Sequence, residues 1–340
     1  MATLKAASKE LFRRAPDERY ASLESLEQFC REQKERSVDR WQPPQSIVPT
    51  VRDGLIVTDI GSDGAFALND WSFSQLCRLA GVSRDTVNRL SAETACTVFR
   101  ETMPSSKKPL QILTSESVRS IHGTQYSRLW NADLVAMLRD SATDFEPPQK
   151  GIDGATGLYA GEQDMFCFLI DPLGWVEIGD EAFAPGLFAW NSEVGKRSLG
   201  VQTFWFQAVC KNHIVWDATE VVDWTRKHTG DVADGLNTMR DIICRLVKRR
   251  DERKDAFAKV IANAMTAKLG DDADEALKVL NRNGITRTMA KKAIEVAQQQ
   301  GALTVFSVVD ALTRLAQDTD FVGLRTDAEQ KASALLALAL

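Results

Sequence analysis

Residues 158–217 carry the pattern that most restricts how this chain can fold. Five short segments rich in aromatic and β-branched residues follow one another here: MFCFLI, WVEI, GLFAWNSE, LGVQTFWFQAVC and HIVWD. Asp-Pro, Gly-Asp, Pro-Gly and Gly-Lys dipeptides, which favour turns, separate them. Five of the eight tryptophans lie between residues 175 and 224, which favours a packed sheet. We therefore predict a set of antiparallel strands.

The pattern becomes helical after residue 230. Apolar residues recur at helical spacing, and Gly270, Gly284, Gly301 and Gly323 fall between the segments as stops. The segments are 234–268, 273–282, 286–299, 305–317 and 327–339.

Upstream of residue 158, helical and strand-like segments are mixed. A helix is expected within 17–37, followed by a polar connector, and Asp53-Gly54 between two β-branched runs predicts a hairpin. Ser62-Asp63-Gly64 reads as a turn. Next we expect a strand at 65–69 and a helix at 71–80 that is capped by Asn69 or Asp70 and ended by Gly81. We then expect a short helix after Ser83, a helix at 92–102, a strand at 110–113, a helix opened by Asn131 or Asp133, and a loop at 147–157.

Together these segments predict an α+β fold, with a mainly antiparallel sheet core, a helical corner and a helical C-terminal region. The expected divisions are an N-terminal helix and connector over 1–46, an α+β core domain over 47–230, and the helical region over 231–340.

The charge balance limits the class of partner. Lys and Arg number 42 against 47 Asp and Glu, a net charge of −5. This excludes a strongly basic nucleic-acid binder as a description of the whole chain. Acidic residues concentrate at 17–27, 140–181 and 271–275, however, and basic residues collect at 196–254. Local binding of nucleic acid therefore stays open.

Targeting and cofactor motifs are missing from the sequence. No apolar signal-peptide segment or 18-residue apolar run is present, and the six cysteines form no CxxC pair, so we expect a cytoplasmic protein with reduced thiols. The phosphate loop GxxxxGK[ST], the dinucleotide motif GxGxxG and the GxSxG elbow are also missing. These observations disfavour NTPases, dehydrogenases and serine hydrolases, and we expect no cofactor.

Residues 73–90, FSQLCRLAGVSRDTVNRL, match the spacing of a helix-turn-helix. That interpretation places five side chains at DNA: Ser83, Arg84, Thr86, Asn88 and Arg89. Helix–Gly–helix corners are common, and this one sits within a strand-bearing core, so a structural corner is the favoured interpretation.

Metal-ligand patterns are weak. His122, His213 and His228 form no close pair, and Cys210-x-x-His213 lacks a second pair to complete a tetrahedral zinc site. Four carboxylates near the first strands could hold Mg²⁺, but turn and outward strand positions explain them better: Glu162, Asp164, Asp171 and Glu177. We expect no metal.

Two stretches combine basic, amide and aromatic groups as a nucleic-acid site requires. One is RSIHGTQYSRLWN at 119–131, and the other runs from the Lys196-Arg197 turn to the TRKHTG segment. Most Trp and Phe residues of the strands are expected in the core. The candidate binding residues in these stretches are Arg119, His122, Tyr126, Arg128, Asn131, Lys196, Arg197, Lys211, Asn212, His213, Arg226, Lys227 and His228.

The segment 240–254 carries seven positive and three negative residues, a net charge of +4. On a helix, Arg245, Lys248 and Arg249 lie on neighbouring faces opposite an apolar face. Such runs are commonly solvated surfaces, and contact with phosphate groups is the alternative interpretation.

Four blocks in the same order resemble one known family: IHGTQYSRLWN (121–131), PGLFAWNSEVG (185–195), FQAVCKNHIVW (206–216) and RKHTG (226–230). The chain looks like the phage/plasmid-like proteins, a mobile-element domain of unknown function, over roughly residues 50–260. The resemblance implies a bacterial host and supplies no reaction. Residues 73–90 fall inside the region that resembles the family. The resemblance therefore also favours a structural corner there.

Three functional hypotheses follow. The first is a non-enzymatic protein that binds nucleic acid, specifically single-stranded DNA, in replication or recombination of a mobile element. The second is a nucleic-acid- or nucleotide-processing enzyme built on polar groups that interrupt the strands: Asn191, Glu193, Asn212, His213 and His228. The third is an interaction protein that counters a host defence.

A homo-oligomer is also expected, through apolar faces of the last helix. The candidate subunit contacts are Ala332, Leu335, Leu336 and Ala339.

Overall fold

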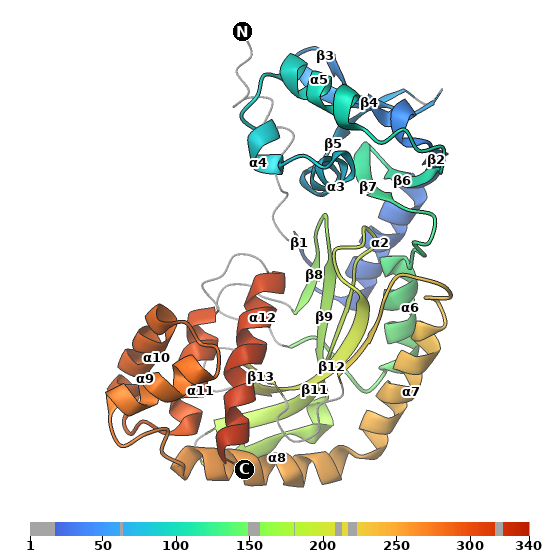
Figure 1. Ribbon diagram of the computed structural model, residues 1–340. Coiled ribbons are helices and arrows are strands. Elements are labelled where there is room, and N and C mark those ends of the chain that lie inside the picture. Colours follow the sequence, from blue (N-terminus) through green and yellow to red (C-terminus); the bar gives the residue numbers. More distant parts are fainter. Residues whose placement is uncertain are drawn as a thin grey trace.

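The computed structural model describes residues 18–61, 64–148, 157–179, 181–207, 213–216, 223–316 and 322–339 of the chain (Figure 1). This part forms two mostly antiparallel sheets with helices packed around them, which confirms the predicted α+β class. Predicted features that lie wholly or partly outside the described residues include the turn at Ser62-Asp63, most of the loop at 147–157, and the end of the strand predicted at 199–210.

Sheet B is the smaller sheet and lies at the top of Figure 1. In spatial order its strands are β2 (Val38–Gln42), β6 (Leu110–Thr114), β7 (Ser117–His122), β5 (Ala65–Leu68), β4 (Leu55–Asp59) and β3 (Thr50–Arg52). The predicted hairpin is confirmed, since Asp53 and Gly54 take φ of 50° and 76°. The predicted polar connector is wrong at 38–42, because β2 pairs with β6 there.

Three helices cover one face of sheet B: α3 (Asp70–Ala80), α4 (Arg84–Val87) and α5 (Ala92–Thr102). Asn69 caps α3 and Gly81, at φ 68°, ends it, as the sequence predicts. The second helix of the corner, α4, has only four residues, and its Arg84 pairs with Asp70 of α3. A helix of one turn is too short to read a DNA groove, so the favoured structural corner agrees with the structure.

Sheet A is the larger sheet. The main path of strands is β1 (Glu18–Arg19), β8 (Leu158–Ala160), β9 (Met165–Ile170), β11 (Glu181–Asn191), β12 (Leu199–Gln207) and β13 (His213–Trp216). Beside it, β10 (Val176–Ile178) pairs with β11, and β14 (Asp223–Arg226) pairs with β12. All these pairs are antiparallel, which confirms the predicted strand set.

Both faces of sheet A are buried. On one face, small and aliphatic residues such as Leu169 and Ala189 pack against α2 (Leu23–Arg36), α6 (Asn131–Ser141) and α7 (Gly235–Lys248). The opposite face carries an aromatic cluster that includes Phe168 and Phe188, whose ring centroids lie 4.3 Å apart. Most of the described strand aromatics are therefore core residues, as predicted.

The C-terminal helices pack against the far end of sheet A through Phe183 and Trp205. They are α8 (Arg250–Thr266), α9 (Ala273–Arg282), α10 (Arg287–Gln300), α11 (Val305–Ala316) and α12 (Val322–Ser333), followed by a 3-10 segment at Ala334–Ala339. The predicted subunit contacts are wrong for Ala332, Leu335 and Leu336, because all three are buried in this core, and Ala339 packs against it.

The described cysteines are free thiols, four of them buried: Cys30, Cys77, Cys96 and Cys167. Cys244 is exposed, and Cys210 lies outside the described residues. Among the described residues, no helix is both long and apolar enough to span a membrane.

Candidate functional site

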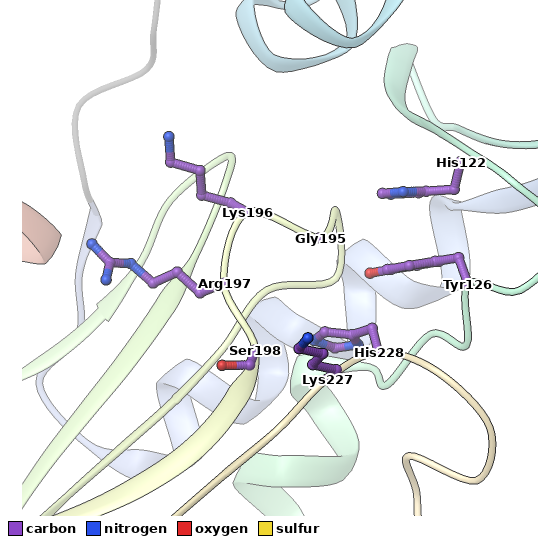
Figure 2. A pocket seen from close by; sticks show the side chains of 8 residues that line it. All are labelled: His122, Tyr126, Gly195, Lys196, Arg197, Ser198, Lys227 and His228. Carbon is purple, nitrogen blue, oxygen red and sulfur yellow. The ribbon is translucent and has the colours of Figure 1, made fainter. Parts of the chain in front are cut away.

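An open pocket of about 270 Å³ brings together three segments that are far apart in the chain (Figure 2). His122 ends β7, and Tyr126 lies in the loop after it. Gly195, Lys196, Arg197 and Ser198 come from the turn between β11 and β12, and Lys227 and His228 follow β14. Six of these eight lining residues belong to the predicted binding set: His122, Tyr126, Lys196, Arg197, Lys227 and His228.

The turn between β11 and β12 forms one wall of the pocket. The backbone N–H of Lys196 donates to the Ser192 hydroxyl over 2.9 Å, and the Ser192 hydroxyl donates to the Gln163 carbonyl. Gly195 takes φ 75°, a conformation that favours glycine. A Cβ at Gly195 would lie 2.6 Å from Cε1 of His122, so the turn approaches the histidine as closely as a glycine allows.

A buried network of polar groups fixes the position of this turn. Glu193, at 1% exposure, pairs with Arg119 over 2.9 Å, and it accepts the backbone N–H of Asn131 over 2.8 Å. The Asn191 amide donates to Oδ1 of Asn131 over 2.8 Å. The structure therefore places Arg119 and Asn131 inside the protein as supports of the turn.

Arg128 is a second buried support. Its guanidinium pairs with Asp39 of β2 over 2.7 Å and donates to the Glu193 carbonyl. It also lies over the ring of Tyr126, 5.3 Å from the centroid, and the Tyr126 hydroxyl donates to the Glu193 carbonyl over 2.9 Å. Arg128 thus ties sheet B to the turn, and its charge is already balanced by Asp39.

Three rings form a stack along one side of the pocket. The ring centroids of His122 and Tyr126 lie 3.7 Å apart at an interplanar angle of 7°, and those of Tyr126 and His228 lie 5.4 Å apart at 24° (Figure 2). Both faces of Tyr126 are therefore covered by histidines. The tyrosine is part of the wall, and its faces are not open to a stacked base.

His228 is a buried ring in the wall of the pocket. It is 6% exposed, and its Nδ1 lies 3.1 Å from the Ser127 carbonyl, which can only accept, so Nδ1 carries the proton. Burial lowers the pKa of His228, and the ring is therefore neutral near pH 7. Nε2 is buried, and the ring also lies against the Arg197 backbone.

His122 is likewise a neutral ring. Burial and the nearby Arg128 guanidinium lower its pKa from 6.5 to about 3. In the unfolded chain the imidazole of His122 takes up a proton near pH 6.5, whereas in the folded chain it stays neutral down to about pH 3. Stability contributed by the neutral His122 is therefore present above pH 6.5 and is lost as the pH falls toward 3.

We therefore predict that lowering the pH from about 7 to about 5 reduces the free energy of unfolding of the wild-type protein by about 2 kcal/mol more than that of a His122→Asn variant. The asparagine does not titrate, while carboxylates and His228 contribute to both proteins alike. Urea unfolding at the two pH values measures the difference. Equal losses in the two proteins would show that His122 protonates normally in the fold.

The cations of the pocket differ in how far they are neutralised. Arg197 pairs with Asp164 over 3.1 Å and with Asp327 over 3.3 Å. Lys196 is exposed and lies 4.9 Å from the ring centroid of Trp71, the residue after the start of α3. Neither Lys196 nor Lys227, which is also exposed, has an ion pair among the described residues. These two lysines supply the available positive charge.

The other predicted residues within the described ranges do not line this pocket. Arg226 pairs with Asp234 over 3.3 Å. Arg245, Lys248 and Arg249 are exposed on and just after α7, toward the end that leads into α8 at the base of the molecule (Figure 1). His213 lies in β13, and Lys211 and Asn212 fall outside the described residues.

Two of the four carboxylates considered for Mg²⁺ form ion pairs with arginines. Asp164 pairs with Arg197, and Asp171 pairs with Arg250. Across the described ranges, no group of three or more His, Cys, Asp or Glu side chains is arranged to hold a metal ion.

Sequence reasoning missed Trp71, Asp39 and Gly195. Trp71 donates its indole N–H to the Val194 carbonyl over 2.6 Å and so positions the turn from α3. Neither Trp71 nor Asp39 lies in a motif, and only the packing of the two sheets brings them here. Gly195 had a local signal, because a glycine between two strands marks a turn that needs positive φ.

The fold and this pocket define an α+β protein with an open, cation-lined site beside two neutral histidines. No protein-family model, curated protein or solved structure matches the chain. The assignment of a function therefore depends on the site itself.

Proposed function

We propose that this protein binds single-stranded DNA at the pocket, in replication or recombination of a mobile element, and acts without catalysing a reaction. The observation that carries the proposal is the convergence of three distant segments on one pocket that includes two lysines without an ion pair among the described residues. Lysine ammonium groups at such a site attract phosphate groups of a nucleic-acid backbone.

The size of the pocket favours a single strand. A volume of about 270 Å³ holds roughly one nucleotide unit. A nucleotide of a duplex would first have to leave its stack, which costs a few kcal/mol, whereas a single strand presents its phosphates, sugars and bases without this cost.

Negative charge near the pocket limits its affinity for DNA. Arg197 is balanced by two aspartates, and the whole chain carries a net charge of −5. Binding should therefore depend on Lys196 and Lys227 and weaken steeply with salt.

Removing both lysines tests the proposal. We expect the double variant Lys196→Ala, Lys227→Ala to bind a labelled oligonucleotide of about 20 nucleotides at least about tenfold more weakly at about 50 mM salt, because two phosphate contacts are lost. The slope of log K against log salt should become shallower by about 1.4. Fluorescence anisotropy over a salt series measures both quantities.

A matched control removes two exposed lysines from the loop between α5 and β6, as Lys107→Ala, Lys108→Ala. This control should bind as the wild type does. Wild-type binding that is undetectable at about 50 mM salt, or equal losses in the two double variants, would contradict the proposal.

A nucleotide-processing enzyme is the second candidate, favoured by one observation. The neutral imidazole of His228 lines a cationic pocket, and a neutral imidazole can act as a general base. Of the other residues considered for this function, Asn191 and Glu193 belong to the buried network behind the turn. Incubation with end-labelled single strands tests the candidate, and a product lost in His228→Gln would favour an enzyme.

A further inference from the structure

A second basic surface lies on the corner between α9 and α10, apart from the pocket. Between Glu275 and Glu295 the chain carries five cations and no acidic residue. All five are exposed, and none has an ion pair among the described residues: Lys278, Arg282, Arg287, Lys291 and Lys292. This run contains no acidic residue, whereas the basic segment 240–254 contains three. Sequence analysis did not single it out because the acidic cluster at 271–275 lies directly before it.

The corner has the local geometry of a helix-turn-helix. Gly284 takes φ 80° after α9, and Ile285 inserts into the core of the C-terminal helices. The Thr286 hydroxyl then caps α10 by accepting the backbone N–H of Met289. The chain thus turns from α9 into α10 through a glycine, a buried apolar residue and a capping residue, which are Gly284, Ile285 and Thr286.

The second helix separates its buried and exposed faces. Ala290, Ala293, Ile294 and Ala297 are buried against the neighbouring helices. Arg287, Thr288, Lys291 and Lys292 are exposed on the opposite face, with Glu295 as the acidic residue one turn further along. The apolar face is already used by the core, so α10 presents a polar, cationic surface.

We propose that α10 enters the major groove of duplex DNA, with α9 lying against the backbone. The 14 residues of α10 span about 21 Å, and a groove about 12 Å wide admits one helix. Arg287 and Lys291 are one turn apart, and Lys292 lies beside them. These side chains reach phosphates or base edges from one exposed face. The four-residue α4 of the other corner lacks this length.

Duplex DNA fits this surface better than the other anionic partners. An interfacial membrane helix must expose an apolar face to lipid, and the apolar face of α10 is buried. An acidic protein is the remaining anionic partner, and the polyglutamate measurement below separates it from duplex DNA. The proposal is independent of the pocket, because Figure 1 shows α9 and α10 at the outer edge of the C-terminal helices.

The test uses the full chain and measures single-stranded and duplex DNA separately. We expect the triple variant Arg287→Ala, Lys291→Ala, Lys292→Ala to bind a mixed-sequence duplex of about 20 base pairs at least about tenfold more weakly at about 50 mM salt. The salt slope for the duplex should become shallower by about 2 to 3. Single-strand binding should remain unchanged, and the Lys196, Lys227 double variant should show the reverse pattern.

A matched triple variant, Arg100→Ala, Lys107→Ala, Lys108→Ala, removes the same charge from exposed positions near sheet B. Far-UV circular dichroism and thermal unfolding check that both triple variants fold. Duplex binding by the α10 variant within about twofold of the wild type would overturn the proposal. Equal wild-type affinity for polyglutamate, lost in the same variant, would overturn the duplex assignment and identify a general anion surface.

Discussion

Replacement of Glu193 by alanine is expected to lower the free energy of unfolding by about 3–5 kcal/mol. Glu193 is 1% exposed, and its carboxylate is the partner of the Arg119 side chain, which is 6% exposed. Alanine would leave the Arg119 guanidinium in the interior without a counter-charge, although Ser37 and Gln33 still accept hydrogen bonds from it. The backbone N–H of Asn131 at the start of α6 would also lose its acceptor.

The variant Glu193→Gln separates the contribution of the negative charge to stability from that of the hydrogen bonds. Glutamine has nearly the same volume and can still accept from Asn131, so its loss of stability should be smaller than that of alanine. Glu101→Ala, at an exposed position on α5, should change stability by less than about 0.5 kcal/mol. Urea unfolding measures all three variants. A loss below about 1 kcal/mol for Glu193→Ala would mean that Arg119 finds water or another acceptor instead.

The elements that the sequence predicted correctly follow local rules. Asp53-Gly54 specifies a hairpin because both residues adopt positive φ, and Asn69 and Gly81 mark the ends of α3 through a cap and a left-handed residue. The strands of sheet A were recognisable because short segments rich in aromatic and β-branched residues are separated by dipeptides that favour turns. Such signals depend on neighbours within a few residues.

The roles of the charged site residues could not be predicted in the same way. Arg119, Arg128 and Lys196 looked alike in sequence as basic residues among aromatic ones. Arg119 and Arg128 are buried because carboxylates from elsewhere in the chain, Glu193 and Asp39, meet them, while Lys196 lies on an exposed turn. Burial of a cation depends on a distant partner, which the local pattern does not contain.

β2 illustrates the same limit for secondary structure. Its sequence, VDRWQ, is polar and short, and it is followed by Pro43 and Pro44, so it was assigned to a connector. The strand forms because β6 offers an unpaired edge, and hydrogen bonding to that edge outweighs weak local preference. Its placement matters for the site, since β2 supplies the Asp39 that holds Arg128.

Gly195→Ala is expected to destabilise the fold by about 2–4 kcal/mol and to weaken binding of single-stranded DNA at the pocket. The left-handed conformation at φ 75° alone costs an alanine about 1 kcal/mol. The added Cβ would also lie 2.6 Å from Cε1 of His122 and 3.1 Å from Cε2 of Tyr126. Both rings are held in the stack, so the turn has to move away and carry Lys196 with it.

Gly81→Ala is the matched control for this substitution. Gly81 has a similar φ of 68°, and a Cβ there meets nothing within 4 Å, so alanine should cost only the conformational part, about 1 kcal/mol, with no change in DNA binding. Urea unfolding and anisotropy measure the two effects side by side. Equal destabilisation by the two alanines would mean that the contact between the turn and the ring stack is loose. In that case the stack could not position Lys196, and the pocket would lack the rigid wall that the proposed binding site requires.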